Sequence, residues 1–287
     1  MTRPAATQKA SAALPDRSVA QRRFDAVAAG FDAACAIHDH ARATLLNRLR
    51  WFELEPQCIV DLGCGTGRGS AALQALYPTA RILGIDTSSA MLQHAADRCP
   101  SASLLRGDAA CLPLADASVE LLLACLVLPW CEPQAVLREA ARVLAPGGVL
   151  LAATTGPRTL EQLRRAWRSV DEAVHVHAGF DMQMLGDFIA QAALAEPVLD
   201  TELVTLQYSG SASLHAELRA VAAVNAAAGR RRTLTGRRRY EAYEKALTVN
   251  ANGGLAVSVE LIFAQAFGAE AASAPTASFH GIPIQRG

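Results

Sequence analysis

The stretch Val60-Asp-Leu-Gly-Cys-Gly-Thr-Gly67 decides the fold, because it joins an apolar run to a helical pattern. The run Cys58–Leu62 predicts a buried strand, and residues 70–77 have helical spacing. Glycines allow the backbone to turn tightly and approach a ligand, and amides at the helix start face the polar atoms of that ligand. The stretch therefore predicts a strand, a ligand-binding turn and a helix.

Short apolar runs and amphipathic stretches alternate on both sides of this turn. The predicted strands are 80–85, 102–107, 119–128, 148–154, 197–208 and 255–267, and the predicted helices are 18–49, 89–99, 132–144, 159–175, 180–193, 211–226 and one ending near 249. Strands that alternate with helices predict an α/β fold with a doubly wound, mostly parallel sheet. The second half adds two strands to the edge of this sheet, and its helical insertions are expected to cover the strand ends as a lid.

The domain organisation follows from these patterns. We expect a flexible tail at 1–18, a ligand-binding core at 19–155, the rest of the sheet with its lid at 156–267, and a low-complexity tail at 268–287. No apolar run reaches the roughly 18 residues of a membrane span. Seven cysteines without a CxxC pair indicate reduced thiols and a cytoplasmic protein. His175 and His177 have no third ligand nearby, so no metal site is predicted.

The charge balance excludes some partners. Lys+Arg 27 against Asp+Glu 27 gives a net charge of zero, which argues against general binding to duplex nucleic acid. Six arginines nevertheless lie within ten residues: Arg230, Arg231, Arg232, Arg237, Arg238 and Arg239. Such a run creates a strong local field. An RNA site is a rival interpretation, but the run lacks the interleaved aromatic residues of a stacking platform.

Two acids identify the class of ligand at the glycine turn. Asp86 ends the second predicted strand, where a carboxylate accepts hydrogen bonds from ribose hydroxyls, and Asp108 follows the third, where it accepts from an adenine amino group. The dinucleotide pattern G-x-G-x-x-G fails, because Arg68 or Ser70 stands at its third position. The turn also has no lysine for phosphate. A nucleoside without phosphate indicates S-adenosylmethionine.

These motifs resemble those of class I S-adenosylmethionine-dependent methyltransferases, together with Arg142-Val-Leu-Ala-Pro-Gly-Gly148. The resemblance implies a Rossmann-like sheet of seven strands with the last one antiparallel. It also implies contacts with the methionine end, the ribose and the adenine of the cofactor. The implied cofactor residues are Asp61, Gly63, Gly65, Gly67, Asp86, Met91, Asp108, Ala109 and the backbone near Cys125.

Narrower features resemble the malonyl-acyl-carrier-protein O-methyltransferases of biotin synthesis. They are residues 21–49, Leu128-Pro-Trp-Cys131, residues 159–175 and the basic segment 224–239. The resemblance implies a malonyl-acyl carrier protein or malonyl-CoA as acceptor. Phe31, His38 and Pro129 depart from the Tyr, Gln and Gln that are usual in that family, and Phe31 has no phenol hydroxyl through which to orient the acceptor. The same architecture occurs in a complex I assembly factor.

A carboxylate acceptor fits these residues, because it is already ionised at neutral pH and needs no general base. No catalytic residue is identified, but Trp130, Phe31 and His38 are candidates for orienting the acceptor. Candidates for binding its carboxylate or docking the carrier are Arg164, Arg165, Arg168 and the six arginines of the basic run. Two alternatives stay open: a methyltransferase for another small carboxylic acid, and a non-methylating assembly or regulatory factor.

Overall fold

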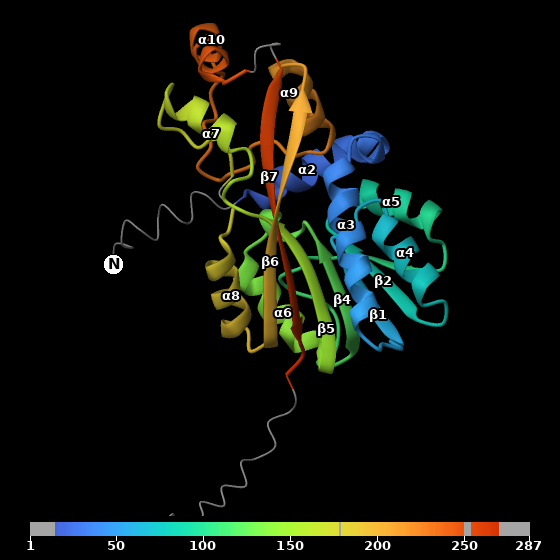
Figure 1. Cartoon of the computed structure of the whole chain (residues 1–287). Coiled ribbons are helices and arrows are strands. Elements are labelled where there is room, and N and C mark those ends of the chain that lie inside the picture. The colour runs from blue at the N-terminus through green and yellow to red at the C-terminus, as the bar shows by residue number, and fades with distance from the viewer. Residues whose placement is uncertain (1–14, 178, 250–253, 270–287) are drawn as a thin grey trace, which may run out of the picture.

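The computed structural model describes residues 15–177, 179–249 and 254–269, and within them a sheet runs in the order β3-β2-β1-β4-β5-β7-β6 (Figure 1). The strands are β1 (Cys58–Leu62), β2 (Arg81–Asp86), β3 (Ser103–Arg106), β4 (Val119–Cys125), β5 (Leu144–Thr155), β6 (Ala195–Tyr208) and β7 (Leu255–Phe267). The first five strands pair in parallel, and β7 runs antiparallel to both β5 and β6. The doubly wound, mostly parallel sheet predicted from the sequence is confirmed.

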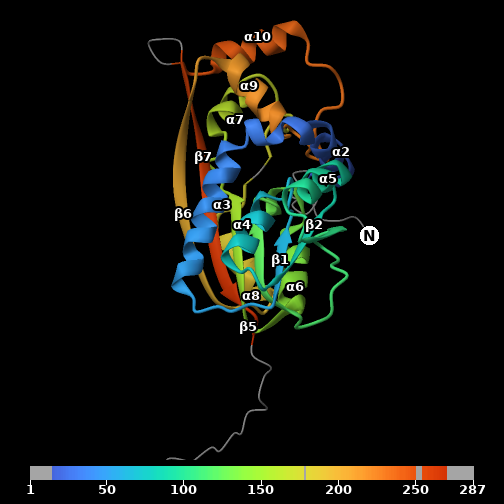
Figure 2. The same cartoon turned by 90° about the vertical axis from the view of Figure 1, so that its right-hand side faces the viewer.

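Helices cover both faces of the sheet (Figures 1 and 2). On one face lie α3 (Ala36–Arg48), α4 (Arg68–Leu76) and α5 (Ser89–Arg98), and on the other α6 (Pro133–Val143) and α8 (Met182–Gln191). Each face has its own apolar core, with Leu45 and Leu73 against Ile59 on one side and Val136 against Leu62 on the other. Because both faces are covered, every residue of β1 is buried.

Strand β4 ends earlier than predicted, and this places the chain over the edge of the sheet. The apolar run 119–128 predicted one strand, but β4 stops at Cys125. Leu126 adopts a left-handed conformation (φ 57°), and a short helix η3 (Leu128–Trp130) begins with Pro129 near its first position. The turn lifts Trp130 out of the sheet and over the carboxyl ends of the strands.

The N-terminal helical region is broken. Residues 18–49 were predicted as helical throughout, whereas the structure has α2 (Arg17–Val27), then η1 (Ala28–Ala33), then α3 and η2 (Leu49–Trp51). Asp16 caps α2 by accepting a hydrogen bond from the Val19 amide, so the helix begins inside the expected tail. Residues 1–14 of that tail, and residues 270–287 of the other, lie outside the described residues. The break lets α2 lie across the strand ends while α3 packs on the sheet.

Three further helices lie beyond the carboxyl ends of the parallel strands: α7 (Glu161–Arg168), α9 (Ser211–Ala220) and α10 (Arg237–Ala246) (Figure 1). The predicted helices 159–175 and 211–226 are both too long. The side chain of Asn225 donates to the carbonyl of Val174, and Val174 forms a β-bridge with Arg230. The segment that follows α7 and the segment that follows α9 therefore pair irregularly with each other. No helix of the described residues is long and apolar enough to cross a membrane.

The lid has a small aromatic core. The Trp167 ring stacks on His175 at 3.8 Å between centroids and on Tyr243 of α10 at 4.2 Å. His175 also hydrogen-bonds to Asp171 at 2.7 Å. No group of three metal-ligating side chains occurs in the part of the chain that the structure describes. Trp167 thus has a stacking partner on each face of its ring, His175 and Tyr243, and joins α7 to α10.

Candidate functional site

A cavity of about 640 Å³ opens at the carboxyl ends of β1, β2 and β4. Its volume suits a ligand of cofactor size. The residues expected to bind a cofactor converge on it: Asp61, Gly63, Gly65, Asp86, Met91, Asp108, Ala109 and Cys125 all line its wall. The helix α2 contributes another part of the wall through Phe24 and Gln21. The residues predicted from the sequence to bind a cofactor thus lie around one cavity, although the sequence did not predict that α2 covers it.

Gly67 is the expected cofactor residue that does not line the cavity. It has φ +79° and ends the turn before α4, and a Cβ there would lie 2.8 Å from the Cα of Ala95. Gly63 has φ +70°, and a Cβ there would lie 2.9 Å from Val127. Both glycines thus permit close packing of the turn: Gly67 lets it approach α5, and Gly63 lets it approach Val127 at the cavity wall.

Asp61 is a buried carboxylate at the base of this cavity. Its side chain accepts a hydrogen bond from the Ser70 hydroxyl at 2.7 Å. Burial raises the pKa of Asp61 to about 6, and the Ser70 hydrogen bond and the positive charge of Arg42 act in the opposite direction. Asp61 is therefore mostly ionised at neutral pH but poorly solvated. A cationic ligand group beside it would relieve that cost.

Asp86 and Asp108 mark the other side of the cavity. Asp86 accepts hydrogen bonds from the amides of Gly65 at 2.9 Å and Ser88 at 2.8 Å; burial raises its pKa and these bonds oppose the rise. Asp108 accepts from the amide of Ala110 and forms an ion pair with Arg17 of α2. The backbone thus fixes Asp86, whereas Arg17 closes α2 over Asp108.

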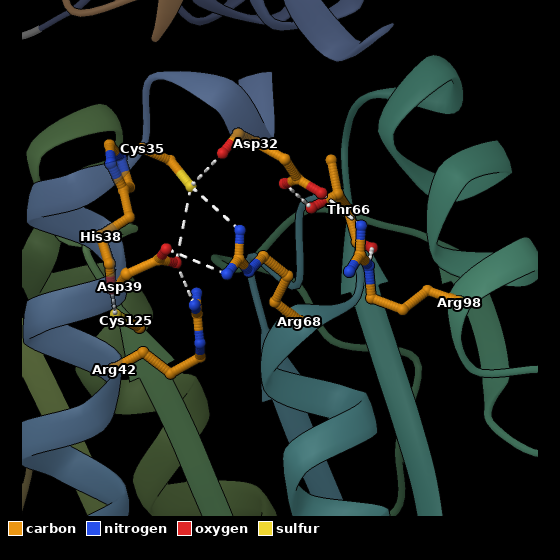
Figure 3. Close-up of polar contacts among 9 residues, drawn as sticks. All are labelled: Asp32, Cys35, His38, Asp39, Arg42, Thr66, Arg68, Arg98 and Cys125. Atoms are coloured by element: carbon orange, nitrogen blue, oxygen red, sulfur yellow. Dashed lines mark hydrogen bonds and ion pairs between the residues drawn. The ribbon is translucent and has the colours of Figure 1, made fainter. Parts of the chain in front are cut away.

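An ionic network fixes the N-terminal helices to the glycine turn (Figure 3). Asp32 of η1 accepts from the Thr66 hydroxyl at 2.7 Å and pairs with Arg98 of α5. Asp39 of α3 pairs with Arg42 and, at 3.0 Å, with Arg68. Both of these arginines line the cavity. The sequence analysis missed them, because nothing in the local pattern of α3 indicates that it packs beside the glycine turn.

A second cavity, of about 280 Å³, adjoins the first beneath the lid. His38, Leu126 and Trp130 line both cavities and so form a shared wall. The Trp130 ring meets Phe24 at 5.1 Å and His177 at 5.2 Å between centroids, both nearly edge-on. The expected orienting residues Trp130 and His38 thus lie between the two cavities. Phe31 lines the first cavity and packs on His38.

The two histidines at this wall are neutral. Burial lowers the pKa of His38 and of His177 to about 4, and nearby Arg42 and Arg23 lower it further. The Nδ1 atom of His38 is buried without a hydrogen-bond partner in the described residues. Because an imidazole with so low a pKa is a weak base, neither histidine is suited to remove a proton from an alcohol or amine.

None of the arginines proposed to bind the acceptor lines either cavity. Arg164 donates to the backbone carbonyls of Pro157, Thr159 and His177 at 2.7, 3.1 and 3.0 Å, and so fixes the loop beside the second cavity. Arg230 lies 3.6 Å from Asp16 and Arg231 lies 3.7 Å from Asp171. The arginine in the wall of the second cavity is Arg219 of α9, which the sequence analysis did not single out.

Comparisons with known proteins agree with this arrangement. A family model described as a methyltransferase domain matches residues 60–152. The YcgJ protein from Bacillus subtilis shares the fold, with a TM-score of 0.58 and 17% identity, over 80% of this chain and 99% of that one.

Two relatives are similar along most of their length. The malonyl-[acyl-carrier protein] O-methyltransferase of Laribacter hongkongensis is 34% identical over 265 residues, which is 88% of this chain and 89% of that protein. The protein of the same name from Xylella fastidiosa is 37% identical over 254 residues, which is 86% of each chain. The chain therefore belongs to the malonyl-[acyl-carrier protein] O-methyltransferase family.

Proposed function

We propose that this chain transfers the methyl group of S-adenosylmethionine to the free carboxylate of malonyl-acyl carrier protein. Family membership and the two adjoining cavities support this proposal. In the reaction an oxygen of the carboxylate forms a bond to the methyl carbon as the carbon–sulfur bond breaks. The sulfur keeps the electron pair and leaves as the neutral thioether of S-adenosylhomocysteine, so no proton has to move.

The first cavity fits an adenosyl group that carries a charged amino acid. The poorly solvated carboxylate of Asp61 would face the ammonium group, with Arg42 and Arg68 beside it for the carboxylate. Asp86 and Asp108 would accept from the ribose hydroxyls and the adenine amino group. When bound, the cofactor supplies a sulfonium whose methyl carbon is electrophilic. The protein has to aim that methyl at the shared wall.

The residues at the shared wall determine which acceptor is favoured. Trp130 and His38 separate the cavities, and His38 and His177 are too weakly basic to assist an acceptor that must lose a proton. A carboxylate needs no such help, since it is ionised at neutral pH. The apolar lid would strip its water and hold it in line with the methyl group. This combination is the observation on which the proposed acceptor rests.

The basic segment suits an acidic carrier protein. Arg232, Arg238 and Arg239 have no ion pair with any residue that the structure describes, and Leu234 between them is 95% exposed. Unpaired arginines around an exposed apolar side chain favour an acidic partner with an apolar patch. Malonyl-CoA shares the malonyl thioester and the pantetheine arm but lacks the protein surface. We therefore propose that the arginines bind the carrier rather than the acceptor carboxylate.

The proposed product has a clear metabolic use. Esterification removes the charge of the malonyl group, and the esterified acyl group can then serve as an apolar primer for fatty-acid elongation toward biotin. We further propose that residues 19–155 bind the cofactor, that residues 156–267 supply the lid and substrate insertions over the acceptor site, and that the reaction takes place in the cytoplasm.

The proposal is tested by incubating the protein with methyl-labelled S-adenosylmethionine and malonyl-carrier protein. We expect a base-labile label on the carrier. Acetyl-carrier protein, which lacks the free carboxylate, is the control and should stay unlabelled. Tight binding of S-adenosylhomocysteine without label on malonyl-carrier protein would contradict the proposed reaction. If replacement of all six arginines by alanine affected the turnover of malonyl-CoA and of malonyl-carrier protein equally, a small-molecule acceptor would be indicated.

A further inference from the structure

His177 occupies a loop that the surrounding backbone holds on several sides. Arg164 donates to its carbonyl at 3.0 Å, and the amide of Ala226 donates to its Nε2 at 2.6 Å. Asn225 ties the Ala226 segment to Val174, three residues before His177. The imidazole is therefore fixed in position by two lid segments that are far apart in the sequence.

The Ala226 contact also fixes the tautomer of His177. A backbone amide is always a donor, so Nε2 must offer its lone pair to it. Because the ring is neutral at physiological pH, its proton then resides on Nδ1. No described residue accepts a hydrogen bond from this Nδ1–H, and Nδ1 is not among the enclosed side-chain atoms without a partner.

The imidazole of His177 lies beside the acceptor cavity. His177 lines the second cavity and packs against Trp130, which belongs to the wall shared with the cofactor cavity. Arg23 lies near enough for its positive charge to act on His177, which makes the surroundings favourable for an anion. A neutral donor of fixed direction in an apolar cavity selects ligand atoms that carry lone pairs and disfavours N–H groups.

We propose that the Nδ1–H of His177 donates a hydrogen bond to the acceptor carboxylate and positions it for methyl transfer. This inference rests on the proposed function. His177 is then a specificity-determining residue. Its Nδ1–H group donates a hydrogen bond to a carboxylate oxygen, whereas an amine would present hydrogen atoms to the same N–H group and bind poorly. Loss of one hydrogen bond to a charged group in a dry cavity corresponds to about a tenfold to hundredfold fall in kcat/KM.

Paired variants test the proposal. His177→Met removes the donor, whereas in His177→Gln the amide oxygen can accept from Ala226 while its NH2 group donates. We expect His177→Met to lower kcat/KM for malonyl-carrier protein by about tenfold to hundredfold, His177→Gln to retain most of it, and S-adenosylhomocysteine affinity to change little in both. His94→Met on α5, outside both cavities, is the control. Wild-type kcat/KM in folded His177→Met, or an equal loss in His177→Gln, would overturn the proposal.

A second readout separates this inference from the proposed function. Nitrogen NMR of the imidazole should show the Nδ1–H tautomer of His177 in the free enzyme and a shift of the Nδ1 signal when malonyl-pantetheine is added to the complex with S-adenosylhomocysteine. A proton on Nε2, or an Nδ1 signal that malonyl-pantetheine leaves unmoved, overturns the inference even if the wild-type enzyme methylates malonyl-carrier protein. A wild-type enzyme without that activity contradicts the proposed function instead.

Discussion

The guanidinium of Arg23 donates a hydrogen bond to the carbonyl of Val224 at 2.9 Å, and so joins the helix that covers the cofactor cavity to a segment that lines the acceptor cavity. The amide of Asp16 donates to the carbonyl of Ala226 at 2.7 Å beside it. The covers of the two cavities are thus one hydrogen-bonded unit. Ordering of α2 by the cofactor should therefore also order the acceptor site.

Replacement of Arg23 by alanine tests this coupling. Binding of malonyl-pantetheine should be strengthened by S-adenosylhomocysteine in the wild type, by about fivefold or more if the covers order together. In Arg23→Ala the enhancement should shrink toward unity. Calorimetric titrations with and without S-adenosylhomocysteine measure it. Arg22→Ala, at an exposed neighbouring position of α2, is the matched control, and an enhancement that survives in Arg23→Ala would refute the coupling.

We expect ionised Asp61 to lower the stability of the free protein while it strengthens cofactor binding. Its folded-state pKa of about 6 lies above the ordinary 3.8, so the folded protein holds this proton more tightly than the unfolded chain. The ionised group therefore destabilises the free protein as pH rises from 3.8 through 6. Asp61→Asn should raise the free energy of unfolding at pH 8 by up to about 3 kcal/mol, with the gain vanishing below pH 4.

Chemical denaturation at the two pH values measures this difference, and S-adenosylhomocysteine affinity should fall by at least about tenfold in the same variant, because the ionic contact with the ammonium is lost. Asp97→Asn, on the exposed side of α5, should change neither quantity. An Asp61→Asn protein that is less stable at pH 8 would show that the burial cost has been assigned to the wrong group.

His177 should make the protein sensitive to acid. Its folded-state pKa of about 4 lies below the ordinary 6.5, so below pH 6.5 the unfolded chain takes up the proton first. Its contribution to stability is full above pH 6.5 and is lost as pH falls from 6.5 to 4. The fall in unfolding free energy over this window should be smaller in His177→Gln than in the wild type by about 3 kcal/mol. Parallel curves for the two proteins would contradict a buried neutral imidazole.

Two glycines with similar positive φ angles should respond differently to replacement by alanine. Gly147 has φ +72° with nothing within 4 Å of an added Cβ, so Gly147→Ala carries only the backbone cost of about 1 kcal/mol. Gly67→Ala adds a close contact with the Ala95 backbone and should destabilise by about 1–3 kcal/mol more. Urea unfolding compares the two variants. Equal losses would mean that the turn does not depend on close packing against α5.

The basic segment should matter for the carrier alone. Replacing Arg237, Arg238 and Arg239 by alanine should raise KM for malonyl-carrier protein by about tenfold, mostly through slower association at low salt, while kcat and turnover of malonyl-pantetheine stay near wild type. Arg138→Ala and Arg158→Ala, outside this segment, serve as the control. An unchanged KM for the carrier would assign the docking surface elsewhere.

The sequence predicted those parts of the site that lie next to a strand end. Asp61 and Asp86 lie at the carboxyl ends of β1 and β2, and Asp108 follows β3. Because parallel strands bring their carboxyl ends together, local patterns were sufficient to predict these residues. Arg42 and His177 reach the cavities from a helix and a loop whose docking depends on tertiary packing. The periodicity of the sequence does not indicate such docking. The prediction that the arginines bind the acceptor failed for the same reason. Arg164 donates to backbone carbonyls that come together only in the folded lid.

In the proposed reaction a carboxylate in the second cavity attacks a methyl group that is presented at the wall of His38 and Trp130. The most direct measurement is intact-protein mass spectrometry of malonyl-carrier protein after one turnover with S-adenosylmethionine. We expect a mass gain of one methylene unit that mild alkali removes as methanol and that acetyl-carrier protein never shows. A gain that resists alkali, or no gain from enzyme saturated with cofactor, would contradict the proposed reaction.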